Sequence, residues 1–158
     1  MADVPDLLPV EPGYKNVLRA RLAFVWLVFT AGALFLGYAL DDETRFAMLL
    51  PAAVFLAGLL VVAIAPRRIY RRLGYVLSER LLQVVRGWLF HTDTVVPLVR
   101  VQHLDVVRGP FDKIFGTATL VLHTAGTHNS TVTVPGLAPD RAAAMRDIIR
   151  EHVRTDFA

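Results

Sequence analysis

Two stretches decide the fold of this chain: LAFVWLVFTAGALFLGYAL, Leu22–Leu40, and FAMLLPAAVFLAGLLVVAIA, Phe46–Ala65. Neither stretch contains a charged residue, and only Asp41–Arg45 separates them. Because a helix rises about 1.5 Å per residue, about 20 residues span the roughly 30 Å hydrocarbon core of a bilayer. Hydrocarbon offers the backbone no hydrogen-bond partners, so each stretch must form its backbone hydrogen bonds internally, as a helix. The sequence therefore predicts a transmembrane hairpin with spans 22–40 and 46–65.

Composition excludes several classes of protein. Hydrophobic residues make up 54% of the 158 residues and charged residues 20%, so the chain is neither disordered nor an ordinary soluble globule. A cleaved signal peptide would be shorter, and a helix of a soluble protein would keep a polar face, so we disfavour both alternatives for these stretches. The chain has no cysteine, which excludes disulfides, thiol catalysis and cysteine-bound metals.

The flanking charges predict an orientation. Seven cationic residues flank the spans: Lys15, Arg19 and Arg21 before the first, and Arg67, Arg68, Arg71 and Arg72 after the second. The loop between the spans holds one arginine and three acids. Since Lys and Arg concentrate on the cytoplasmic side, we expect both termini in the cytoplasm and the acidic loop outside.

The regions outside the hairpin differ from each other. Residues 1–21 contain three prolines and predict a flexible cytoplasmic lead. Residues 67–158 carry 13 Arg or Lys and 8 Asp or Glu, a net charge of +5, and are numerous enough for one small cytoplasmic domain.

Hydrophobic alternation predicts that this domain is rich in strands. Apolar and polar residues alternate over Ala118–His123 and Thr131–Val134, on either side of a predicted turn at residues 125–129. Further strands are expected over Tyr70–Leu77 and Arg80–Arg86. Val95–Val96 and Val99–Val107 indicate two more strands or one bent strand, with Pro97 at an edge or bend. From Pro139 an amphipathic helix is expected, with an apolar stripe of Met145, Ile148, Ile149 and Val153. We therefore expect six or seven antiparallel strands in a bent sheet, closed by this helix.

Two further motifs carry a family resemblance. They are VPLVRVQHLDVVRGP, Val96–Pro110, and FGTATLVLHTAG, Phe115–Gly126. Both resemble YdbS-like bacterial membrane proteins, and the resemblance covers nearly the whole chain. Asp112-Lys113 stands, with mild variation, where the family has an acidic–basic pair. The resemblance implies a two-helix hairpin followed by a pleckstrin-homology-like domain of about seven antiparallel strands and a C-terminal helix. It implies the bacterial cytoplasmic (inner) membrane and no known catalytic activity.

Three groups of residues are candidate sites. Arg67, Arg68, Arg71 and Arg72 could hold lipid headgroups, although setting topology alone explains them as well. His103 and Asp105 share one strand face, and we interpret them as a structural hydrogen bond rather than an acid–base pair. The third group, Phe111, Ile114 and Phe115, either packs a corner of the sheet or contacts the membrane or a partner.

These observations lead to one preferred function and one alternative. The preferred hypothesis is a non-enzymatic, membrane-anchored binding or scaffold module that presents its domain to a membrane-protein partner or to its own copies. The alternative is anionic headgroup binding or membrane-stress sensing through the four arginines. The five histidines show no metal-ligand spacing, so neither a metal nor a cofactor is expected. Basic residues beside the membrane without an aromatic stacking motif also disfavour nucleic acid as a partner.

Overall fold

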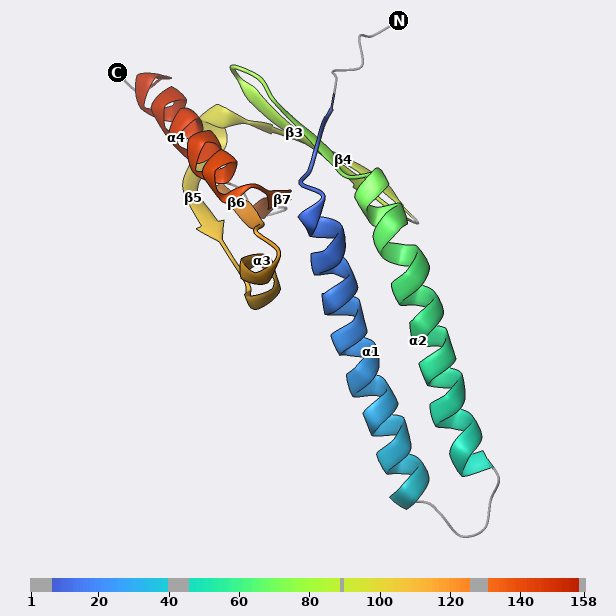
Figure 1. Cartoon of the computed structure of the whole chain (residues 1–158). Helices are drawn as coiled ribbons and strands as arrows, with labels where there is room; N and C mark the ends of the chain where they lie inside the picture. Colours follow the sequence, from blue (N-terminus) through green and yellow to red (C-terminus); the bar gives the residue numbers. More distant parts are fainter. Residues whose placement is uncertain (1–6, 40–45, 89, 126–130, 157–158) are drawn as a thin grey trace, which may run out of the picture. The chain divides into compact units, whose positions relative to one another are not determined.

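The computed structural model describes residues 7–39, 46–88, 90–125 and 131–156 (Figure 1). The chain divides into two compact units. One unit is residues 15–68, and the other combines residues 1–14 with residues 69–158. The predicted loop Asp41–Arg45 and most of the predicted turn at 125–129 lie outside the described residues.

Two long helices form the first unit. Helix α1 is Gly13–Ala39 and helix α2 is Phe46–Arg71, and both are long and apolar enough to cross a membrane. Both extend beyond the predicted spans, α1 at its beginning and α2 at its end. The helices approach closely at Gly58, where a Cβ atom would lie 3.0 Å from the Trp26 side chain. Large apolar side chains such as Leu27 and Phe35 point outward, as a lipid-facing surface requires.

The N-terminal segment differs from the flexible lead predicted for residues 1–21. Strand β1, Leu8–Pro9, pairs with strand β2, Gly74–Leu77, and α1 begins at Gly13. Val10 and Tyr14 are buried, the Tyr70 hydroxyl donates to the Val10 carbonyl at 3.1 Å, and the Glu11 N–H donates to the Gly136 carbonyl at 2.7 Å. Proline fits this edge strand because an edge position does not require its missing N–H. Residues 7–14 are therefore part of the second unit's fold.

Seven antiparallel strands form two sheets in the described residues. Sheet A has the order β1-β2-β3-β4, with β3 at Leu81–Gly87 and β4 at His91–Pro97. Sheet B has the order β5-β6-β7, with β5 at Val101–Val107, β6 at Ala118–Thr124 and β7 at Thr131–Leu137. A short 3₁₀ turn, η1 at Leu98–Arg100, joins the sheets. The predicted antiparallel strands are confirmed. One of the seven comes from the N-terminal segment, and Pro97 ends an edge strand as expected. The strand predicted from Tyr70 begins only at Gly74, because α2 continues to Arg71.

A C-terminal helix covers part of the sheets. Helix α4, Pro139–Asp156, packs against β5, β6 and η1 (Figure 1). Ala142, Met145 and Ile149 are buried, whereas Ile148 is 47% exposed, so its predicted place in the apolar stripe is wrong. Adjacent helical residues lie about 100° apart, which turns Ile148 away from the face centred on Ile149. Alternate residues Leu120, Leu122, Val132 and Val134 complete the core from sheet B.

The contact between Gly136 and Tyr14 generates a stability prediction. Gly136 has a φ of +74°, and a Cβ there would lie 2.6 Å from the Tyr14 ring. Gly116 has a similar φ of +66° but open space around it, so it is a matched control. We expect Gly136→Ala to lower the free energy of unfolding by about 2–3 kcal/mol and Gly116→Ala by about 1 kcal/mol. Thermal unfolding of the whole chain in a non-ionic detergent measures both. Equal losses would show that the N-terminal segment does not pack on β7.

Candidate functional site

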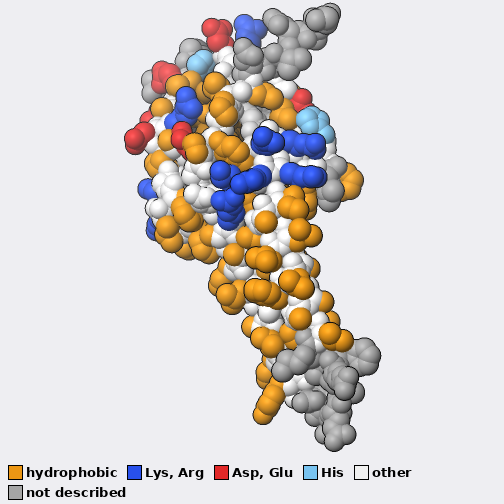
Figure 2. Space-filling view, turned by 45° about the vertical axis from the view of Figure 1, so that its right-hand side comes forward, with side chains coloured by type: hydrophobic (Ala, Val, Ile, Leu, Met, Phe, Trp, Pro, Cys, Tyr) orange, Lys and Arg blue, Asp and Glu red, His pale blue; other side chains and the backbone are white. Residues whose placement is uncertain are grey.

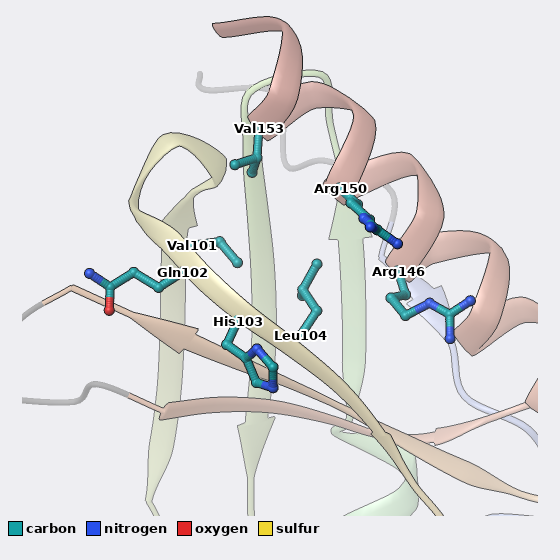
Figure 3. A pocket seen from close by; sticks show the side chains of 7 residues that line it. All are labelled: Val101, Gln102, His103, Leu104, Arg146, Arg150 and Val153. Atoms are coloured by element: carbon teal, nitrogen blue, oxygen red, sulfur yellow. The ribbon is translucent and has the colours of Figure 1, made fainter. Parts of the chain in front are cut away.

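A groove of about 340 Å³ lies between β5 and α4 (Figure 3). It is lined by Val101, Gln102, His103 and Leu104 of β5 and by Arg146, Arg150 and Val153 of α4. Strand β5 is at the edge of sheet B, and in Figure 3 the Gln102 side chain points away from α4. The groove thus combines apolar side chains from both elements with cationic groups from the helix.

The two arginines of the groove are not equivalent. They lie one turn apart on α4, which places them on one side of the helix. Arg146 forms an ion pair with Asp147, with Nε 2.9 Å and Nη2 2.8 Å from Oδ1. Arg150 is exposed, and no ion pair is recorded for it among the described residues. Arg150 is therefore the cation that an acidic ligand in this groove would meet. The helical spacing of the two arginines was visible in the sequence, but their position beside β5 was not.

The predicted His103–Asp105 pair is present and extends across sheet B. His103 Nε2 lies 3.1 Å from Asp105 Oδ1, and His123 Nε2 lies 3.4 Å from Asp105 Oδ2. The strand register pairs His103 with His123, so both rings and the carboxylate share the outer face. Side-chain exposures of 41–70% leave all three groups in contact with solvent. The sequence analysis missed His123, although the alternation in Ala118–His123 already placed it on that face.

A hydroxyl group lies beside the histidine pair. Thr131 Oγ1 lies 3.4 Å from His123 Nδ1, which is long for an activated hydroxyl. The β5–α4 groove is lined by His103 but not by Asp105. Among the described residues, no group of three or more His, Asp or Glu is arranged to hold a metal ion. His103 and Asp105 thus lie within hydrogen-bonding distance of each other, on the one strand face where the sequence placed both.

The four candidate arginines lie at the end of α2. Arg67, Arg68 and Arg71 belong to its last two turns, and Arg72 follows directly. All four are exposed, and none takes part in an ion pair recorded among the described residues. Arg72 Nη1 donates to the Trp88 carbonyl at 3.0 Å. Figure 2 shows one face of the molecule, on which Lys and Arg side chains gather in a group. Guanidinium groups this exposed are available to anionic groups in their surroundings.

The buried carboxylate of Asp112 stabilises the loop that contains Phe111, Ile114 and Phe115. Asp112 is 1% exposed, and it accepts hydrogen bonds from the Gly109 N–H at 3.1 Å and the Thr117 hydroxyl at 2.8 Å. These bonds fix helix α3, Pro110–Ile114, and the turn after it. Phe111 and Phe115 are half-buried, whereas Ile114 is 71% exposed. The sequence analysis noticed Asp112 only as part of a motif. An acid at the third position of a helix that begins with proline is a known capping signal.

Comparison with known proteins supports the resemblance read from the motifs. The family model for the bacterial PH domain matches residues 21–153. The transmembrane protein YdbS of Bacillus subtilis (strain 168) is 35% identical over 103 residues, which cover 65% of this chain and 63% of YdbS. No solved structure matches the chain. The two apolar helices, the antiparallel sheets and the C-terminal helix agree with these matches. The chain is thus a membrane protein with two apolar helices long enough to span a bilayer, and it belongs to the bacterial PH domain family.

Proposed function

We propose that this protein is a non-enzymatic membrane-anchored module that presents its PH-like domain, on the cytoplasmic side of the bacterial inner membrane, to a protein partner or to a second copy of itself. The distribution of Lys and Arg around the spans supports this orientation. Neither the family description nor the name of the relative mentions a catalytic activity. The chain aligns with less than two thirds of YdbS. The proposal therefore concerns binding by this module and not an activity of the whole relative.

The observation that carries the proposal is an exposed isoleucine on a firmly held loop. Ile114 stays 71% exposed although Asp112 fixes the loop from beneath through two hydrogen bonds. A loop that is already ordered loses little conformational entropy when a partner covers its apolar side chain. The half-buried rings of Phe111 and Phe115 enlarge the apolar surface beside it. These three residues therefore form the contact surface that we propose.

Photo-crosslinking tests this surface in native membranes. A photoreactive phenylalanine at position 114 should give a discrete adduct with a protein. The same probe at Ile148, which is 47% exposed on α4, should give little or none. Two copies with different tags separate an adduct between copies from an adduct with another protein. Adducts with lipid alone, or equal adducts from both positions, would contradict the proposal.

Headgroup binding through Arg67, Arg68, Arg71 and Arg72 is the second candidate. The exposure of the four guanidinium groups favours it, as does the lack of an ion pair for any of them among the described residues. Each cation near an anionic leaflet contributes roughly 1 kcal/mol.

Replacing all four arginines with Gln should remove anionic lipid that co-purifies in mild detergent, as measured by mass spectrometry of the extracted lipids. Replacing them with Lys keeps the charge and is the matched control. Retention of that lipid by the Gln variant would count against this role. Loss in both variants would indicate that guanidinium geometry, rather than charge, is recognised.

A further inference from the structure

Arg86 lies on the inner face of sheet A, at a strand position where the alternation of buried and exposed residues predicts a core side chain. The register pairs Leu82 with Val96, Val84 with Thr94, and Arg86 with Thr92. Leu82 and Val84 are fully buried, and alternate residues of a strand share a face. A guanidinium group therefore lies at the end of a row of core side chains.

The hydrogen bonds of Arg86 go to neutral oxygens, so they do not pair its positive charge with a negative one. Its Nη1 donates to the Thr133 hydroxyl at 3.3 Å and its Nη2 to the Thr133 carbonyl at 3.0 Å. The Nε–H is buried and has no partner in the described part of the chain. The recorded ion pairs of that part do not include Arg86. Partly burying an unpaired cation is costly, and an anionic ligand would lower that cost.

A polar cavity of about 260 Å³ opens beside this guanidinium. Arg86, Thr92 and Thr94 of sheet A line it together with Thr131 and Val132 of β7. The Thr131 hydroxyl lies near His123, so Thr92 and Thr94 supply the hydroxyls for which no hydrogen bond is recorded. Each terminal nitrogen of Arg86 also keeps one N–H beyond its bond to Thr133. The described residues thus bring a cation and neutral donors to the cavity, and none of those that line it is acidic.

We propose that this cavity, between β3, β4 and β7, binds a tetrahedral oxyanion of the phosphate class. The fork of a guanidinium matches two oxygens of such an anion, and the threonine hydroxyls can donate to the others. The site does not depend on the proposed partner surface or on the arginines of α2, since it shares no residue with either. The phosphate group can belong to a free ion or to a lipid headgroup, because both present the same oxygens.

Isothermal titration calorimetry of the whole chain in a non-ionic detergent tests the site. Sodium phosphate is titrated at constant ionic strength set with sodium chloride, and glycerol 3-phosphate is titrated in parallel as a soluble headgroup. Binding of a ligand to one site makes the cumulative heat rise along a saturable curve. The exclusion of phosphate from protein surfaces gives no such saturable rise. A saturable rise with phosphate indicates a free ion, and one with glycerol 3-phosphate alone indicates a headgroup.

Two variants and one control decide the result. Arg86→Gln should abolish the saturable rise, whereas Arg100→Gln, an exposed arginine of η1, should keep it. Thr92→Val with Thr94→Val keeps the guanidinium and should raise the half-saturating concentration about tenfold, which tests the site even if Arg86→Gln fails to fold. The proposal is overturned if neither ligand gives a saturable rise. It is also overturned if the rise persists in Arg86→Gln, or if the folded Thr92→Val/Thr94→Val variant binds as tightly as the original chain.

Discussion

The structure depends on one constraint, which is that backbone groups in hydrocarbon must find hydrogen bonds within their own segment. Two charge-free stretches joined by five residues can meet it only as antiparallel helices. An antiparallel pair returns the chain to the side on which it began. Residues that precede α1 can then pair with residues that follow α2, as β1 and β2 do. The hairpin is therefore what allows an N-terminal strand to complete the sheet of a domain that begins more than sixty residues later.

The PH-like domain buries the carboxylate that holds its α3 loop in place and leaves Ile114 of the proposed contact surface exposed. Asp112 is buried beneath its loop, while Ile114 on the same loop faces solvent. The arginines at the end of α2 are exposed in the same way. Arg86 differs from these arginines, because it lies on the inner face of sheet A and has no ion pair within the part of the chain that the structure describes. A partly buried unpaired cation is the kind of local conflict that natural proteins keep where function requires it.

Sequence patterns predicted the elements of the fold better than the contacts among them. Long apolar runs identified the two long helices, two-residue alternation identified strands, and apolar residues at helical spacing identified the final helix, because these patterns follow directly from backbone geometry. They missed β1, since a two-residue strand with proline has no periodic signal. They also placed Ile148 in the wrong part of the helix face. The proximity of His123 to Asp105, and of Arg86 to Thr133, depends on strand register and sheet packing, which no local pattern encodes.

The central claim is that the hairpin holds the PH-like domain on the cytoplasmic side of the membrane. Since the chain has no cysteine, single cysteines can report its topology without background. Glu43→Cys in the loop and Ser78→Cys between β2 and β3 are treated in intact spheroplasts with a maleimide that cannot cross the membrane. The account predicts labelling at position 43 at once and at position 78 only after permeabilisation. Labelling of position 78 in intact spheroplasts would contradict it.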